Sequence, residues 1–142
     1  PDDGEALPLD VCFVLRDGSD VTLVTWGAQV KETLEAAEAL EKLGISAEVI
    51  DVATIKPLDF DTIHESVKKT GRCVIIHEAP RTAGFGAEVA AQLAEKAMFD
   101  LVAPVERVTG YDTHIPLFRL EMKYLPSVEK IMAAVKRTLT VS

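Results

Sequence analysis

The segment from His77 to Leu93 gathers the residue types that most resemble a ligand site in this sequence, HEAPRTAGFGAEVAAQL. An apolar run precedes its Gly-x-Gly and a helical pattern follows it, and a strand, a glycine turn and a helix form many phosphate sites. A dinucleotide fingerprint needs a third glycine, but Val89 stands at that position. Glu88 would compete with a phosphate, and the Gly-Lys-Ser/Thr of a Walker loop is missing. We therefore favour a structural turn over a nucleotide site.

His77 and Glu78 stand at the expected carboxyl end of a strand, the edge of an open α/β sheet where ligands tend to bind. A histidine beside a carboxylate could act as a general base, but we favour a hydrogen-bonded histidine that orients the next loop. His64 is predicted to lie on the solvent face of a short helix, and His114 lies in a loop. No histidines have i, i+4 spacing and none neighbours a cysteine, so no metal site is expected. Without a GxSxG or a Ser/His/Asp set, the residues indicate no complete catalytic site.

The net charge argues against nucleic acid as a partner. The 142 residues include 15 Lys and Arg against 23 Asp and Glu, a formal charge of −8, whereas phosphate binding needs a basic face. The largest local excess of base is Lys130, Lys136 and Arg137, spread along a C-terminal helix. A basic protein partner is more compatible with this charge. No run of about 18 apolar residues occurs, so no membrane span is expected.

The two cysteines, Cys12 and Cys73, lie in apolar runs without CxxC or CxxH spacing. We interpret them as buried free thiols, which suit a reducing compartment. The chain starts with Pro rather than Met, and PDDGEALPL is typical of a linker. We therefore expect a linker over residues 1–8, a domain over residues 9–142, and a longer parent protein.

Two apolar runs at the start, 9–15 and 19–26, flank the turn signal Asp17-Gly18. They predict a β-hairpin, with the first strand antiparallel to the second. Trp26 ends the second run and is interpreted as a residue that packs between layers. Beyond the hairpin, strand and helix patterns alternate. These further elements are helix 28–43, strand 47–52, a short helix after Pro57, strand 72–77, helix 86–98, strand 105–110 and helix 127–140.

The helices carry recognisable ends. The first is predicted to turn Leu43 inward and to end at Gly44, and the second to be capped by Asp59 or Asp61 and to end at Gly71. Right-handed crossovers then place helices on both faces of a mostly parallel sheet. The expected architecture is a three-layer α/β/α domain with a five-stranded sheet whose first strand is antiparallel.

Five separated segments occur in the order seen in one family: DVTLVTWGAQV, AEVIDVATIKPLDFDTI, KKTGRCVIIHEAPRTAGFGAEVAA, APVERVTGYDT and LPSVEKIMAAV. From about residue 8 to residue 140 the chain resembles the C-terminal, transketolase C-terminal-like domain of the beta subunit of thiamine-diphosphate-dependent 2-oxo acid dehydrogenases. This resemblance implies a five-stranded mixed sheet with one antiparallel strand. The loop over residues 111–118 departs from the family pattern, because similar chains have YDTP where His114 stands here.

The resemblance also implies a division of labour. The alpha subunit and the N-terminal domain of the beta subunit hold thiamine diphosphate and magnesium, whereas the C-terminal domain has no cofactor-binding, metal-binding or catalytic residues. That domain contacts a second beta subunit in an alpha2-beta2 assembly, and a basic subunit-binding domain of the dihydrolipoyl acyltransferase docks on it. Interface contacts are expected from His77, Glu78, Arg81, Phe85, Tyr111 and Asp112, and docking contacts from Glu121 and Glu129.

The reaction implied for the parent enzyme is oxidative decarboxylation of a 2-oxo acid, branched-chain or pyruvate, with acyl transfer to lipoamide. Its expected location is the bacterial or archaeal cytoplasm or the mitochondrial matrix, and the fragment alone is expected to be inactive. Two alternatives stay open. One is the matching domain of a transketolase or deoxyxylulose-phosphate synthase, and the other is a nucleotide-binding doubly wound domain.

Overall fold

The computed structural model describes residues 6–141 and contains one five-stranded sheet. Of the predicted linker 1–8, residues 1–5 lie outside the described residues, and residues 6–8 belong to no helix or strand. The strands are β1 (Phe13–Arg16), β2 (Val21–Thr25), β3 (Ala47–Asp51), β4 (Cys73–Pro80) and β5 (Glu106–Gly110). The helices are α1 (Gln29–Glu41), α2 (Phe60–Thr70), α3 (Phe85–Lys96), α4 (Glu121–Tyr124) and α5 (Val128–Thr140), with a 3-10 turn, η1, at Met98–Asp100.

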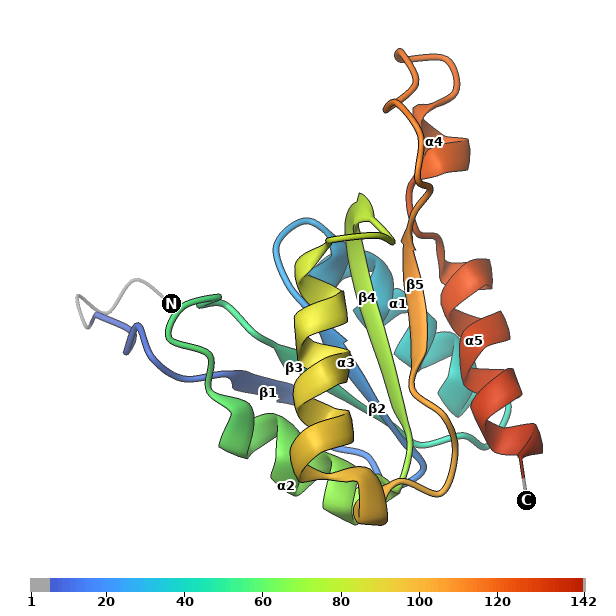
Figure 1. Ribbon diagram of the computed structural model, residues 1–142. Coiled ribbons are helices and arrows are strands. Elements are labelled where there is room, and N and C mark those ends of the chain that lie inside the picture. The colour runs from blue at the N-terminus through green and yellow to red at the C-terminus, as the bar shows by residue number, and fades with distance from the viewer. Residues whose placement is uncertain (1–5, 142) are drawn as a thin grey trace.

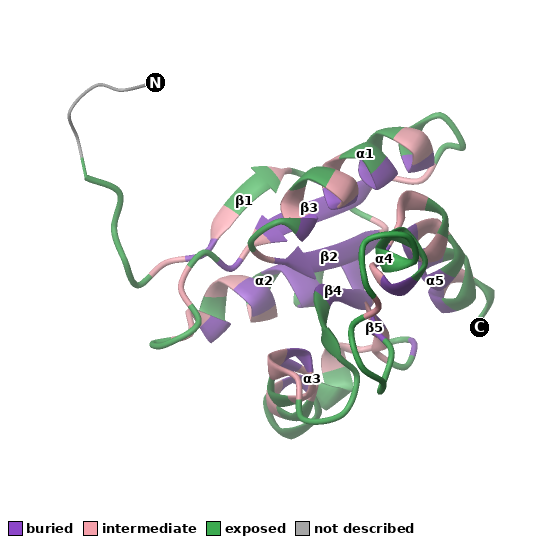
Figure 2. Ribbon diagram, turned by 90° about the horizontal axis from the view of Figure 1, so that it is seen from above, coloured by how far each residue is buried: buried purple, intermediate pink, exposed green. Residues whose placement is uncertain are grey.

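Helices cover both faces of the sheet (Figure 1). The strand order is β1-β3-β2-β4-β5, with β1 antiparallel to its neighbour and the other pairs parallel. One face packs against α1 and α5 through residues such as Leu40 and Ile131, and the other against α2 and α3 through Ile63 and Leu93. Burial is greatest in the central strands (Figure 2), and every residue of β2 is buried. The predicted three-layer α/β/α architecture is confirmed.

The predicted opening hairpin is wrong. β1 pairs with β3, Phe13 lying opposite Asp51, and β3 therefore separates β1 from β2. The predicted turn instead wraps around the start of β3, where Gly18 N donates to Glu48 Oε2 at 3.2 Å. The reason is burial: β2 is buried at all its positions and has parallel neighbours on both edges. β1 has exposed residues and suits an edge, so the first strand is antiparallel as predicted, but to another partner.

The helix ends largely follow the predicted caps. Asp59 Oδ1 accepts a hydrogen bond of 3.1 Å from the first turn of α2, and Gly71 ends that helix at φ 69°. Gly44 has φ 77°, and two hydrogen bonds of 2.9 and 3.1 Å tie it and the next residue to the last turn of α1. Leu43, predicted to face inward, is instead 56% exposed. Leu43 lies two residues beyond the last residue of α1, where the chain already turns away from the core.

His64 does not lie on the solvent face of α2, as the sequence predicts. Its Nε2 atom lies 2.8 Å from Asp100 Oδ2 in η1, and its ring lies 5.8 Å from that of Phe60. The side chain is therefore only 20% exposed. The cause is a tertiary contact. η1 follows α3 in the chain and packs against α2, and the sequence pattern of α2 alone cannot reveal this contact.

Cys12 and Cys73 are buried free thiols, as predicted. Burial raises the pKa of each thiol to about 12, and nearby Asp59 adds to the effect at Cys12. Both side chains therefore stay protonated and pack as small apolar groups. Within residues 6–141, no helix combines the length and the apolar character that a membrane crossing requires.

Candidate functional site

The order of the strands reverses at the carboxyl edge of the sheet, between β2 and β4. The chain passes from β2 through α1 to β3 on one side, and from β3 through α2 to β4 on the other. Such a reversal of strand order marks the position where doubly wound folds bind ligands. Trp26 follows β2 at this edge, and His77 lies in β4 beside it.

Aromatic rings pack against one another at this reversal point. The ring of Trp26 stacks on that of His77 at 5.2 Å with an interplanar angle of 10°, and Phe85 meets Trp26 edge-on at 5.4 Å. His77 is 1% exposed, and no described residue hydrogen-bonds to either of its ring nitrogens, so the prediction of a hydrogen-bonded histidine is wrong. Burial lowers the pKa of His77, and the positive charge of Arg107 lowers it further. Glu78 is exposed, so the histidine and the carboxylate do not form a general-base pair.

The two glycines of the loop pack directly on this histidine. A Cβ at Gly84 would lie 2.8 Å from His77 Cε1 and would overlap the carbonyl oxygen of Pro80. A Cβ at Gly86 would overlap His77 Nε2 and Cδ2 and lie 3.1 Å from Ile75 Cγ2. Contacts shorter than 3.0 Å require something to move, so any side chain here would displace the ring stack. Close packing on His77 thus explains Gly84 and Gly86 without a bound phosphate.

Hydrogen bonds connect the turn after β4 with β5 and with Asp112, which follows β5. Arg81 Nη1 donates to the carbonyl oxygen of Arg107 at 3.1 Å, and Arg107 Nη1 donates to that of Arg81 at 3.1 Å. Asp112 accepts from the backbone N–H and the hydroxyl of Thr82 at 2.8 and 2.7 Å. Those two bonds lower the pKa of Asp112. These four residues therefore tie the turn after β4 to β5 and to the residues that follow β5.

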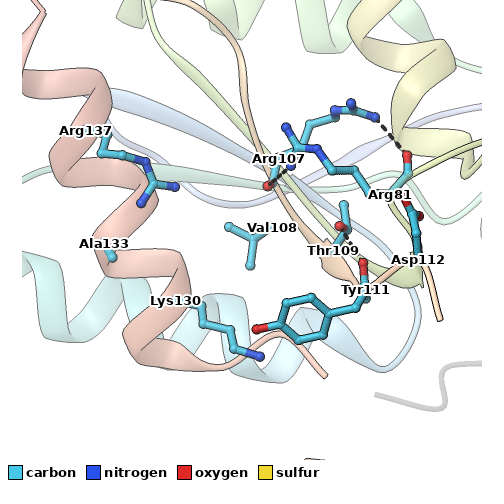
Figure 3. A pocket seen from close by; sticks show the side chains of 10 residues that line it. Arg81, Arg107, Val108, Thr109, Tyr111, Asp112, Lys130, Ala133 and Arg137 are labelled. Atoms are coloured by element: carbon cyan, nitrogen blue, oxygen red, sulfur yellow. Dashed lines mark hydrogen bonds between the residues drawn. The ribbon is translucent and has the colours of Figure 1, made fainter. Parts of the chain in front are cut away.

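A pocket of about 460 Å³ lies between β5 and α5 (Figure 3). Tyr111 forms part of its wall, and the Lys130 Nζ atom lies 5.1 Å from the centre of the Tyr111 ring. Arg137 lines the pocket two turns farther along α5, and its Nη2 atom is 2.8 Å from Glu106 Oε2. Arg81 and Arg107 complete the wall on the β5 side. The pocket thus combines a ring with cationic side chains from three parts of the chain.

An arm, defined as residues 111–125 and including α4, projects beyond the sheet (Figure 1). Its base is fixed by Tyr124, which is 3% exposed and packs so closely on Gly110 that a Cβ there would lie 2.5 Å from the hydroxyl oxygen. The arm exposes many apolar side chains, including Leu117 at 91% and Phe118 at 93%. Exposed apolar patches of this kind mark interaction surfaces.

The residues predicted for interface and docking contacts fall into three places. Two belong to the ring stack, three line the pocket, and three are exposed carboxylates outside both. The ring stack contains His77 and Phe85. The pocket is lined by Arg81, Tyr111 and Asp112. The exposed carboxylates are those of Glu78, Glu121 and Glu129. The backbone N–H of Glu129 itself and the hydroxyl of Ser127 lower the pKa of Glu129.

Sequence reasoning missed the pocket as a site. Lys130 and Arg137 carry a signal, because residues seven apart lie on the same face of a helix. Lys136, adjacent in sequence, is exposed and does not line the pocket. Arg107 carries no local signal, because its role depends on the position of β5 beside α5. No group of three or more His, Cys, Asp or Glu side chains that could hold a metal ion occurs within residues 6–141.

Comparison with known proteins identifies the family. The family model described as "Transketolase, C-terminal domain" matches residues 11–131. The chain belongs to this family. The predicted resemblance to the C-terminal domain of 2-oxo acid dehydrogenase beta subunits is thereby confirmed, because beta subunits are also among the similar curated proteins.

The pyruvate dehydrogenase E1 component subunit beta of Staphylococcus epidermidis is 46% identical over 139 residues, which cover 98% of this chain and 43% of that protein. The mitochondrial 2-oxoisovalerate dehydrogenase subunit beta of Dictyostelium discoideum is 47% identical over 134 residues, covering 94% and 36%. The chain therefore spans less than half the length of the curated relatives it matches.

Solved structures agree with this assignment. A structure titled as a split gene transketolase, an inactive beta4 tetramer, matches with a TM-score of 0.83 and 35% identity, covering 95% of this chain and 43% of that one. A 2-oxoglutarate:ferredoxin oxidoreductase from Magnetococcus marinus matches with a TM-score of 0.60 at 14% identity. The second likeness establishes the fold alone.

Proposed function

We propose that this chain is the subunit-assembly domain of the beta subunit of a decarboxylating 2-oxo acid dehydrogenase, a cytoplasmic or mitochondrial matrix enzyme. The parent enzyme oxidatively decarboxylates a 2-oxo acid, pyruvate or a branched-chain one, and transfers the acyl group to lipoamide. The observation that carries the assembly role is the arm, whose exposed apolar side chains need a covering partner. They include Ile115, Leu117, Phe118, Leu120 and Met122.

In this proposal thiamine diphosphate and magnesium are held by other parts of the enzyme. The residues of this chain do not fit the cofactor, because the rings of Trp26, His77 and Phe85 pack together where the strand order reverses between β2 and β4. The sequence also lacks a Gly-Asp-Gly motif of the type that holds magnesium and diphosphate. The domain alone is therefore inactive in this proposal, and the alpha subunit with the rest of the beta subunit supplies the chemistry.

The second beta subunit would contact the loop and arm through the predicted interface residues. Arg81, Tyr111 and Asp112 are exposed and available for such contacts. His77 is buried and would act only by supporting the loop above it. A basic subunit-binding domain of the acyltransferase would meet the exposed carboxylates of Glu121 and Glu129, attracted by the net charge of −8.

A transketolase is the second candidate, because the split gene transketolase matches with a TM-score of 0.83. The two candidates differ in chemistry, so the complete parent enzyme separates them. Coexpression of the parent beta chain with its alpha subunit should give dye reduction with pyruvate or 3-methyl-2-oxobutanoate, while the present chain alone gives none. Ketol transfer from a sugar phosphate without dye reduction would assign the transketolase reaction instead.

The assembly role is tested by replacing two side chains of the arm. The double substitution Leu117→Ser, Phe118→Ser should weaken self-association about a hundredfold or more, because each buried apolar side chain contributes about 1.5–3 kcal/mol. Sedimentation at several concentrations measures this effect. Leu43→Ser is the matched control, since Leu43 is 56% exposed but lies at the end of α1, away from the arm. A wild-type chain that stays monomeric at every concentration, or equal effects of both variants, would remove the support from the arm.

A further inference from the structure

The pocket between β5 and α5 concentrates positive charge in an acidic protein. Four cationic side chains line it, against the single carboxylate of Asp112, although the whole chain carries −8. Like charges that share one pocket repel, so their grouping costs free energy unless an anion balances them. The four are Arg81, Arg107, Lys130 and Arg137.

Internal partners leave most of this charge in place. Glu106 forms a 2.8 Å ion pair with Arg137. Asp112 directs both of its oxygens to Thr82 rather than to a cation. Within residues 6–141, none of the other three cations has a carboxylate oxygen within 4.0 Å of its charged nitrogens. The wall of the pocket therefore keeps a surplus of positive charge.

The cations line the pocket from different elements (Figure 3): Arg81 and Arg107 on the β5 side, and Lys130 and Arg137 two turns apart on α5. Arg81 and Arg107 each spend one hydrogen bond on the other's backbone oxygen, at 3.1 Å, out of the five N–H donors of a guanidinium. On α5, Lys130 donates to the carbonyl oxygens of Lys123 and Leu125 at 2.9 and 2.7 Å. An ammonium has three donors, so each wall of the pocket retains donors for a ligand.

We propose that this pocket binds a small polyanion of the diphosphate type, that is, a molecule with two adjacent phosphate groups. Guanidinium forks match phosphate oxygens geometrically, and cations on two walls of the pocket suit a ligand with two phosphate groups. The volume of about 460 Å³ lies in the range of small-molecule sites, and a concave pocket suits a small ligand better than a flat protein surface does. The proposal does not rest on the proposed assembly function, although Arg81, Tyr111 and Asp112 line the pocket and are also predicted interface residues.

Calorimetric titration of the 142-residue chain with inorganic pyrophosphate, at low ionic strength and without divalent metal, tests the proposal. Saturable binding of one pyrophosphate per chain is expected. The double substitution Lys130→Gln, Arg137→Gln should weaken it about tenfold or more, because each charge-assisted hydrogen bond contributes strongly. Lys136→Gln should leave the affinity unchanged, since this lysine is on the same helix but outside the pocket. Thermal unfolding confirms that each variant is folded, and the exposed Arg81→Gln substitution should weaken binding independently of α5.

Three results would overturn the proposal. The first is the absence of saturable heat with millimolar pyrophosphate, and the second is an equal loss of affinity in Lys136→Gln, which would indicate diffuse attraction. The third is a loss of self-association in the pocket variants without any pyrophosphate binding by the wild type. That result would assign the pocket to a carboxylate of a second copy, and none of the three would touch the dehydrogenase assignment, which rests on the parent enzyme's reaction.

Discussion

Gly86→Ala should destabilise the domain, although alanine is the better helix former. Helix propensity alone predicts a gain of up to about 1 kcal/mol. A Cβ at Gly86, however, would overlap two atoms of the His77 ring and lie 3.1 Å from Ile75 Cγ2. His77 has no room to move, because it is 1% exposed and stacks on Trp26 at 5.2 Å. We therefore expect a net loss of about 1–3 kcal/mol, the usual cost of overpacking a core.

Urea unfolding measures this loss. With a denaturant slope of about 2 kcal/mol per molar, a loss of about 2 kcal/mol lowers the midpoint by about 1 M. Far-ultraviolet circular dichroism is the suitable signal, because the single tryptophan, Trp26, belongs to the perturbed stack. Gly27→Ala is the matched control: its Cβ meets no atom within 4 Å, and its φ of 62° costs only the left-handed strain of about 1–2 kcal/mol.

The decisive comparison repeats Gly86→Ala in a His77→Ala background. Without the imidazole ring the new Cβ has space, so the second substitution should cost nothing or even stabilise α3. The resulting coupling energy between the two positions should reach about 1–3 kcal/mol, as for residues in direct contact. Equal costs of Gly86→Ala in both backgrounds would refute the collision with His77. A fully stable Gly86→Ala single variant would do the same and would reopen a ligand role for the glycine.

Three further predictions follow from burial and capping. Asp59→Ala should lower the free energy of unfolding in urea by about 1–2 kcal/mol, because Asp59 caps α2 and also accepts a hydrogen bond from Cys12 N at 2.9 Å. Asp61→Ala should change it little, and equal effects of the two variants would contradict the capping role. Burial holds the pKa of His77 below its ordinary value, so the unfolded chain binds a proton at this histidine at higher pH than the folded chain does. The free energy of unfolding should therefore fall by up to about 1.4 kcal/mol per pH unit as pH drops below about 6.5. His77→Gln should flatten this slope, and an unchanged slope would contradict the role of His77. Burial raises the pKa of Cys12 and Cys73 to about 12, so a thiol reagent at pH 8 should label them rapidly only in denaturant, and rapid native labelling would contradict it.

Local signals in the sequence were sufficient for the layers and most helix ends. Gly71 and a capping aspartate, Asp59 or Asp61, could be assigned because a cap depends on its own turn, and burial of β2 follows from its continuous apolar run. The partner of β1 could not be predicted, because a hairpin signal describes neighbours in sequence and β3 competes for the same edge. The prediction for His64 was wrong for the same reason, since the contact of His64 with Asp100 depends on how η1 packs. The pocket needs three elements in place before its cations meet.

Lys130 belongs to both the cationic pocket and the base of the arm. Its Nζ atom holds the end of the arm through the Leu125 oxygen at 2.7 Å, lies 5.1 Å from the centre of the Tyr111 ring, and lines the cationic pocket. A polyanion that competes with the Leu125 oxygen for this ammonium would weaken one anchor of the arm. A partner that repositions the arm must, in turn, change the pocket. Thermodynamic linkage makes these two effects equal as free energies, so occupancy of the pocket and association through the arm would be coupled by the same factor in both directions.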